Sequence, residues 1–192
     1  MTFMELKKYH GRCFVRLTSG QDVDLLNPDP DTILIQDIAS HLSRIQRYNG
    51  ILAKCSDQPM GLSVGIHSLM VAKLLPGSLK LQGLLHDATE AYMGDLVGPL
   101  KDIIPEFKEI ENNLMLAIMQ KFDLGFPLHP LVKEMDKRCL AAEMEHCLGW
   151  VDLASQISGV RLEGFKYPNL TPVQAERAFL GAFEEYSQLA RQ

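Results

Sequence analysis

The sequence has 192 residues, of which 46% are apolar and 22% are charged, and these values are typical of one globular domain. Nineteen Lys and Arg residues against 24 Asp and Glu residues give a formal net charge of −5, which argues against a protein that holds long nucleic acid by neutralising its phosphates. No apolar run approaches the roughly 20 residues that a membrane-spanning helix needs.

The N-terminal part of the chain has β-type patterning. Residues 13–17 (CFVRL) and 22–26 (DVDLL) are short β-type runs on either side of Ser19-Gly20, which predicts a hairpin. Residues 27–31 (NPDPD) then break the chain, because proline removes an amide donor and restricts the residue before it. After this break the apolar period changes from about two to about 3.6, the period of an α-helix.

The rest of the chain is predicted to be mostly helical. Asp31-Thr32 is expected to cap a first helix with one apolar face, and this helix is expected to end at Tyr48-Asn49-Gly50. Further helices are predicted from near Ser63, within the very apolar segment 79–92, and over residues 107–122, 131–150 and 172–189, with a polar loop over residues 55–61.

These elements predict a mostly α protein with a small N-terminal β-hairpin. We expect one domain over residues 1–192, with the hairpin element in residues 1–30 and a helical core in residues 31–192. The apolar side chains of segment 107–122, with those of Phe179, Leu180 and Phe183, exceed what one small domain needs to bury. This surplus predicts a homo-oligomer.

The cysteines and the start of the chain indicate a cellular location. Cys13, Cys55, Cys139 and Cys147 are scattered, with no C-x-x-C pair. Residues 1–10 lack the apolar core of a signal peptide. Both features predict reduced thiols and a cytoplasmic protein.

Two of the six histidines lie in unusual surroundings. His67 lies on the predicted second helix, and His86-Asp87 follows two leucines in the most apolar segment of the chain. A charged Asp87 in such a segment costs several kcal/mol unless something compensates it. Together with Asp136, on another amphipathic helix, these residues would form a mixed nitrogen and oxygen site that suits a divalent ion.

Each of these residues also has a simpler interpretation. A lone His67 is more often a satisfied core or surface histidine than a ligand, and one His-Asp pair is weak evidence of a metal site. Asp136, close to Lys133 and Lys137, fits a solvated helix charge. The order of the four residues, each on a predicted helix, is what favours a metal site.

Three segments carry a resemblance to a known family. Residues 84–101 (LLHDATEAYMGDLVGPLK) form the longest motif, residues 63–68 (SVGIHS) contain the first histidine, and residues 132–143 contain the downstream aspartate. In this order they resemble the motifs of the HD-domain metal-dependent phosphohydrolases, and the resemblance extends from Asp37 to about Glu143. The resemblance implies an HD-domain helical bundle. The family commonly has an acidic residue before the first histidine, where this chain has Ile66.

The resemblance implies a metal site and a catalytic pair. His67, His86, Asp87 and Asp136 would ligate one divalent ion, with Co, Mn, Zn and Mg all open. Glu90, one helical turn after Asp87, would orient or deprotonate the nucleophilic water. Asp95, reaching the site from a loop, would place the nucleophile or protonate the leaving oxygen. In the simpler interpretation Glu90 is a surface residue and Asp95 belongs to a helix-exit turn.

The resemblance also implies substrate contacts. Arg47 and Tyr48, at the end of the predicted first helix, would bind phosphate and stack on the sugar or base. Arg44, one turn earlier, is a weaker candidate, because an Arg-x-x-Arg stripe is usually a solvated helix face. Lys101 would either neutralise a phosphate or balance its neighbour Asp102.

The function that the resemblance implies is hydrolysis of a small deoxynucleotide. The favoured version is a dATP triphosphohydrolase that releases deoxyadenosine and tripolyphosphate, like the phage enzymes that clear dATP, in which case the location is the host cytoplasm. One alternative is a 5′-deoxynucleotidase acting on deoxynucleoside monophosphates, and another is a non-catalytic nucleotide-binding module. The expected partners are a small nucleotide and further copies of the chain, with no nucleic acid polymer and no membrane.

Overall fold

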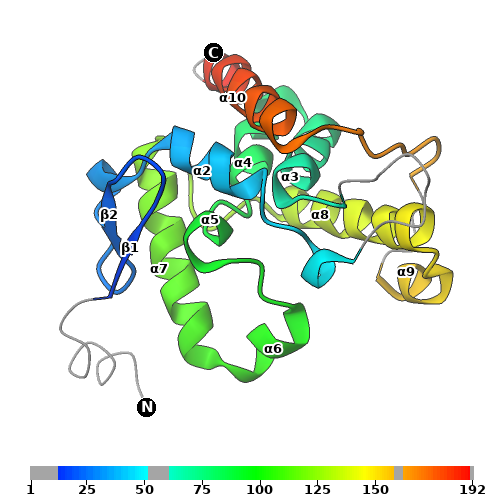
Figure 1. The fold of residues 1–192 in the computed structure, drawn as a ribbon. Coiled ribbons are helices and arrows are strands. Elements are labelled where there is room, and N and C mark those ends of the chain that lie inside the picture. Colours follow the sequence, from blue (N-terminus) through cyan, green and yellow to red (C-terminus); the bar gives the residue numbers. More distant parts are fainter. Residues whose placement is uncertain (1–12, 52–60, 158–161, 191–192) are drawn as a thin grey trace.

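The computed structural model describes residues 13–51, 61–157 and 162–190. Helices make up most of this part of the chain, and a two-stranded hairpin lies at one end, next to α7 (Figure 1). The predicted mostly α fold with an N-terminal hairpin is therefore confirmed. Residues 1–10 and Cys55, which entered the prediction of a cytoplasmic location, lie outside the described ranges.

The hairpin pairs β1 (Phe14–Arg16) with β2 (Asp22–Asp24) in antiparallel register, with Val15 opposite Val23. Val23 is buried in the main hydrophobic core, which is the reason that this face of the hairpin packs on the helices. The turn between the strands contains Ser19-Gly20, as predicted.

The first long helix differs from its prediction at both ends. Asp31 and Thr32 belong to a 3₁₀ turn (Pro30–Thr32) that Asp29 caps, and α2 (Ile35–Leu42) begins after it without a side-chain cap. The helix ends early because the following residues pair with the segment before α3. The Arg47 amide donates to the Leu62 carbonyl at 2.7 Å, and the Val64 amide donates to the Ile45 carbonyl at 3.0 Å. Arg47 therefore lies beyond the helix and beside α3.

The next two predicted helices contain the histidines. α3 (Val64–Leu74) begins directly after Ser63, near which a helix start was predicted, and the Ser63 hydroxyl caps it by accepting from the Ile66 amide at 3.3 Å. The apolar segment that follows is not one helix. It forms α4 (Lys80–Leu85) and α5 (Glu90–Met93), separated by a tight turn over residues 86–89 in which amides bond three residues back.

The second half of the chain is helical with one change of pitch. The bounds are α6 (Gly98–Ile103), α7 (Pro105–Lys121), α8 (Pro130–Ala142), α9 (Val151–Ile157) and α10 (Pro172–Leu189). α7 and α10 agree with the predicted segments. The predicted helix over 131–150 changes to a π-helical segment at Glu143–Leu148 directly after α8. Within the described ranges, no helix is long and apolar enough to cross a membrane.

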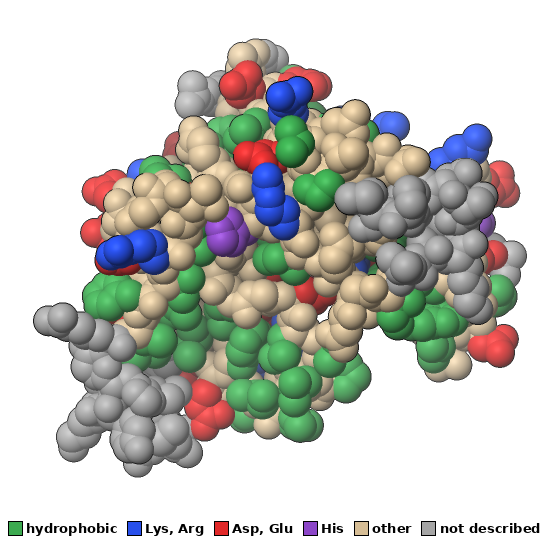
Figure 2. Space-filling model, viewed as in Figure 1, with side chains coloured by type: hydrophobic (Ala, Val, Ile, Leu, Met, Phe, Trp, Pro, Cys, Tyr) green, Lys and Arg blue, Asp and Glu red, His purple; other side chains and the backbone are tan. Residues whose placement is uncertain are grey.

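The side chains that suggested an oligomer are largely covered within the chain. Phe179 is fully buried, and Leu180 and Phe183 pack against the main core together with the apolar face of α7. The reason given for a homo-oligomer therefore does not hold, because these side chains already have partners. Exposed apolar side chains occur elsewhere, and Figure 2 shows hydrophobic side chains gathered on the lower part of one face, over α6.

Candidate metal centre

Three separate elements bring the predicted ligands together. His67 comes from α3, His86 and Asp87 come from the turn between α4 and α5, and Asp136 comes from α8. Asp136 Oδ1 lies 3.0 Å from His67 Nε2 and 3.7 Å from His86 Nε2. Asp87 Oδ2 lies 3.2 Å from His86 Nε2 and 3.9 Å from His67 Nε2. All four side chains predicted from the sequence therefore face one point.

The donor set fits a divalent metal ion. Ligand atoms of His67, His86 and Asp87 lie within 4.8 Å of one another, and both histidines are buried. His86 Nδ1 donates to the Gly83 carbonyl at 2.8 Å, so its tautomer leaves a lone pair on Nε2. That Nε2 is buried and has no hydrogen-bond partner among the described residues. An orphaned imidazole nitrogen beside carboxylates is what a metal ligand needs.

The charges of the group suit a cation. Burial raises the pKa of Asp87, but the adjacent His86 lowers it to about 2. Burial also raises the pKa of Asp136, and hydrogen bonds to the two histidines lower it well below its usual range. Both carboxylates are therefore ionised at neutral pH, as ligands of a divalent ion must be.

Glu143 belongs to this site and was missed by the sequence analysis. It is fully buried, and its Oε1 lies 2.8 Å from His67 Nδ1. Burial raises its pKa, but Arg47 and His67 lower it below its ordinary value. A signal was present, because Glu143 lies seven residues after Asp136 and a seven-residue spacing returns to the same helix face. Its two preceding alanines also indicated a buried position.

The two candidate arginines lie in different surroundings. Arg47 is buried, with Nε 3.0 Å from Glu143 Oε2 and Nη1 3.8 Å from Asp87 Oδ2. Its guanidinium lies over the ring of Tyr48, 5.4 Å from the centroid. Arg44 instead bonds to Ser40 and, at 2.7 Å, to Glu176 on α10. We call the side chains of His67, His86, Asp87 and Asp136 the metal group. The structure brings Arg47 and Tyr48 close to this group and gives Arg44 other partners.

Glu90 and Lys101 form a pair at the edge of the group. Lys101 Nζ donates to Glu90 Oε1 at 3.2 Å and to Glu111 Oε1 at 2.8 Å, whereas Asp102 pairs with Lys108. Glu90 is buried, and its Oε2 has no hydrogen-bond partner in the described part of the chain. Burial, followed by the nearby Asp87 and Asp95, raises the pKa of Glu90 well above its usual value. Such a carboxyl holds a proton more tightly than an ordinary glutamate, which suits a group that accepts a proton during a reaction.

Asp95 approaches the site from the loop after α5. It follows Gly94, whose φ of +79° ends the helix in a conformation that favours glycine. Burial raises the pKa of Asp95, while Arg47 lowers it and Asp87 raises it further. The Asp95 carboxyl is therefore within electrostatic reach of Arg47 and Asp87.

A cavity of about 240 Å³ opens beside the metal group. His86 and Asp87 line it together with two cationic side chains, Lys101, which pairs with the acidic liner Glu111, and Lys133. Its apolar wall consists of Met115, Phe126, Pro127 and Leu128. The cavity is therefore suited to a ligand that is anionic near the ion and extends along an apolar surface.

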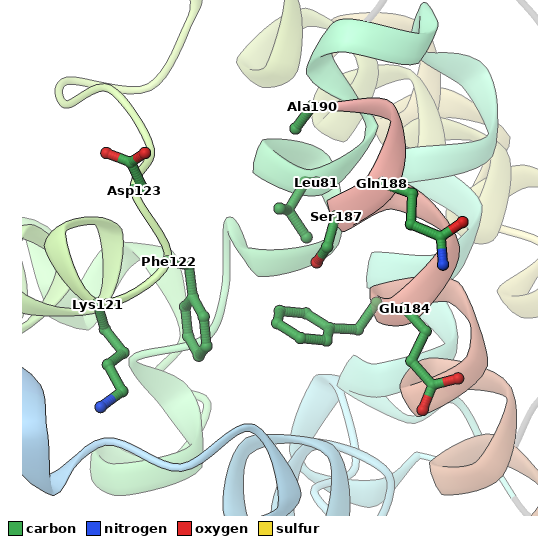
Figure 3. A pocket seen from close by; sticks show the side chains of 9 residues that line it. Leu81, Lys121, Phe122, Asp123, Glu184, Ser187, Gln188 and Ala190 are labelled. Atoms are coloured by element: carbon green, nitrogen blue, oxygen red, sulfur yellow. The ribbon is translucent and has the colours of Figure 1, made fainter. Parts of the chain in front are cut away.

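A second cavity, of about 430 Å³, lies elsewhere, between α4, the end of α7 and α10 (Figure 3). Phe122 and Phe183 both line it, and their rings pack edge-on with centroids 5.1 Å apart. It is larger than the cavity beside the metal group, but no candidate site residue lines it.

No protein-family model matches the chain. The chain is 32% identical over 181 residues to the uncharacterized protein YfdR of Escherichia coli K12, an alignment that covers 93% of this chain and 98% of YfdR. It is also 33% identical over 151 residues to an uncharacterized protein of Rhodobacter capsulatus, covering 72% of this chain and 75% of the relative. The similarity to YfdR therefore extends over nearly the whole length of both proteins.

Proposed function

The chain belongs to the protein family of YfdR, and we propose that it acts as a metal-dependent deoxynucleotide phosphohydrolase. One observation supports this proposal. Two buried histidines and two ionised carboxylates lie together, and a third carboxylate, that of Glu90, lies close to them without belonging to the ligand set. A structural ion-pair cluster does not need a buried imidazole nitrogen and a buried carboxylate oxygen that both lack a hydrogen-bond partner among the described residues. The resemblance to HD-domain phosphohydrolases supports the same chemistry.

In this proposal His67, His86, Asp87 and Asp136 hold one divalent ion, for which Co, Mn, Zn and Mg are candidates. A bound ion of this kind lowers the pKa of water and polarises a phosphoryl oxygen. Glu90 accepts a proton from the attacking water through its free Oε2, while Lys101 holds its other oxygen. Water forms the new bond to phosphorus, the bond to the leaving oxygen breaks, and Asp95 returns a proton to that oxygen.

In this proposal Arg47 and Tyr48 bind the substrate. Glu143 holds Arg47 through Nε, so the other edge of the guanidinium is directed toward Asp87 and can take a phosphoryl oxygen. Tyr48 packs edge-on against Trp150, with centroids 5.9 Å apart, and offers a fixed ring to a sugar or base.

The cavity beside His86 favours a triphosphate over a monophosphate. A monophosphate needs space only at the metal group, whereas this cavity extends from Asp87 toward Lys133. Lys133 lies one turn before Asp136 on α8 and makes no ion pair with the described residues, so its charge is free for an anion. We therefore propose dATP hydrolysis to deoxyadenosine and tripolyphosphate, with deoxynucleoside monophosphate hydrolysis as the second candidate.

The experiment is chromatographic product analysis with all common nucleotides, each with Co²⁺, Mn²⁺, Mg²⁺ or Zn²⁺ and with a chelator. We expect deoxyadenosine and tripolyphosphate from dATP, and no product once the metal is removed. Release of orthophosphate from dAMP alone would favour the nucleotidase. Nucleotide binding without any product would favour a binding module and contradict the enzyme.

A Lys133→Ala variant tests the choice between the phosphate chains. We expect a KM for dATP that rises about tenfold, because one charge-assisted contact to a phosphate is worth roughly 1.5 kcal/mol or more. The KM for dAMP should stay unchanged. Lys137→Ala is the matched control, since Lys137 is exposed on the same helix and does not line the cavity. An equal rise in KM for dATP and dAMP would contradict the proposed position of the triphosphate beside Lys133.

A further inference from the structure

Glu143 is the most completely hydrogen-bonded side chain of the site. Its Oε1 lies 2.8 Å from His67 Nδ1, and its Oε2 accepts from Arg47 Nε at 3.0 Å and from the Tyr48 hydroxyl at 3.0 Å. The side chain has no solvent exposure. One carboxylate therefore joins a candidate metal ligand to both candidate substrate residues.

The contact with His67 decides which ring nitrogen faces the ion. A carboxylate paired with a guanidinium only accepts hydrogen bonds, so the Nδ1 that faces Glu143 must carry a proton. The opposite nitrogen, Nε2, points toward Asp136 and Asp87. When an ion takes the place of the Nε2 proton, Nδ1–H stays on Glu143, and the ring presents the lone pair that ligation needs.

The contact with Glu143 fixes the orientation of the Arg47 guanidinium through its Nε atom. Arg47 is 96 residues away from Glu143 in the sequence and extends from the segment between α2 and α3. Because Nε is held by Glu143, the Nη1 edge is directed toward Asp87. Glu143 also begins the π-helical segment after α8, and such a change of pitch redirects side chains relative to a regular helix.

We propose that Glu143 is a positioning residue that sets the tautomer of His67 and aims Arg47, so that metal ligation and phosphate binding depend on the same carboxylate. This inference rests on the metal-dependent function proposed above. Nothing in it requires Glu143 to touch the ion or the substrate.

The test is Glu143→Gln. An amide has one accepting oxygen, and the buried Arg47 charge and the Tyr48 hydroxyl both require an acceptor. The amide oxygen should therefore turn toward Arg47, leaving the NH₂ group to donate to His67 Nδ1. That donation moves the ring proton to Nε2 and removes the ligand lone pair. We expect the Zn²⁺ affinity, measured by competition with a chromogenic chelator, to fall about 10- to 100-fold.

The second measurement uses the unmodified chain. In the Zn²⁺-loaded protein, a long-range ¹H–¹⁵N spectrum of the His67 ring should show a protonated Nδ1, and this result does not depend on how the variant folds. Asp37→Asn is the matched control, because Asp37 is a buried carboxylate that bonds only Ser19 in the described structure. That variant should lose stability and keep its Zn²⁺ affinity.

The outcomes separate the two proposals. If the unmodified chain binds none of Co²⁺, Mn²⁺, Mg²⁺ and Zn²⁺, the proposed function fails and the role of Glu143 fails with it. If the chain binds Zn²⁺ but His67 Nδ1 carries no proton, or if Glu143→Gln binds Zn²⁺ as tightly as the unmodified chain, only the role of Glu143 is overturned. If the Glu143→Gln variant does not fold, the protonation of His67 Nδ1 in the unmodified, Zn²⁺-loaded chain decides whether Glu143 has the proposed role.

Discussion

Buried charges around the metal group are balanced by neighbours of opposite sign. Arg47 is balanced by Glu143, and Lys101 by Glu90 and Glu111. Burial of charge is costly without such partners, so each side chain is held in one place. Oε2 of Glu90 has no partner among the residues that the structure describes, and it is therefore a site where a proton or a water can be taken up.

At the residue scale we predict the behaviour of Glu90→Ala. If Glu90 handles the nucleophilic water without binding the ion, kcat should fall about 10²- to 10⁴-fold, the usual contribution of general acid–base catalysis. The metal content and the directly measured substrate Kd should stay nearly constant, because the effect lies in the chemical step. Steady-state kinetics and elemental analysis measure these quantities.

Glu109→Ala is the control for Glu90, since Glu109 is an exposed acid of α7. If Asp95 serves the same proton path, the double variant should lose less than the product of the single losses. If Glu90→Ala keeps the wild-type kcat, Glu90 has no role in catalysis. If the variant loses the metal, Glu90 is a metal ligand. Either result contradicts the mechanism.

At the scale of elements, the site depends on how closely α3 crosses the end of α2. A Cβ atom on Gly65 would lie 3.0 Å from the Ser43 amide nitrogen and 3.1 Å from the Leu42 carbonyl carbon. Both are backbone atoms of a buried helix end, so they cannot move aside as a flexible side chain would. The absence of a side chain at Gly65 is therefore what allows His67, half a turn later, to lie near Arg47.

We predict that Gly65→Ala destabilises the protein. The overpacking should cost about 1–3 kcal/mol of the free energy of unfolding, more than alanine gains in helix propensity. Urea denaturation measures the change. Gly181→Ala is the control, because Gly181 lies in the middle of α10 and a Cβ atom added there would meet no other atom within 4 Å. There the substitution should stabilise by about 0.5–1 kcal/mol. A stabilised Gly65→Ala would contradict the close crossing.

At the scale of the whole molecule, the metal should link α3, the turn between α4 and α5, and α8. An ion that binds only the folded chain stabilises it by about 2.7 kcal/mol at a free concentration of 100 Kd. For a chain of this size that corresponds to a rise in Tm of roughly 5–10 °C. Differential scanning calorimetry with Zn²⁺ or with a chelator measures the shift.

Asp87→Ala provides the control for this shift, because it removes a ligand that two histidines face. The variant should show no rise in Tm with Zn²⁺, no bound metal by elemental analysis and no turnover. Stoichiometric metal in Asp87→Ala would contradict the assignment of Asp87 as a ligand.

The expectation of a homo-oligomer remains a prediction, although Phe179 and its neighbours no longer support it. On the described surface, Ile103 is 73% exposed and lies at the end of α6, with Val97 and Leu100 also exposed. A patch of this kind is more often covered than left in water. Light scattering at micromolar concentration should give a mass above the 21.5 kDa of one chain, and a monomeric mass would contradict the prediction.

Elements that depend on local chemistry could be predicted from the order of the residues. The hairpin, the start of α3 near Ser63, α7 and α10 follow from periodicity and proline positions, and their ends lie within a few residues of the predicted ones. The order of His67, His86, Asp87 and Asp136 indicated a common site, and the structure brings these four side chains together.

The positions of the two arginines and of Glu143 depend on contacts between distant segments, which the folded structure reveals. Arg44 and Arg47 look alike in the sequence, but pairing of the Arg47 segment with the segment before α3 ends α2 early and separates them. The change to π-helical pitch at Glu143 likewise accompanies contacts with residues 76 to 96 positions away. Contacts between segments so far apart leave no local pattern, because their energy comes from packing and charge balance that exist only after the chain has folded.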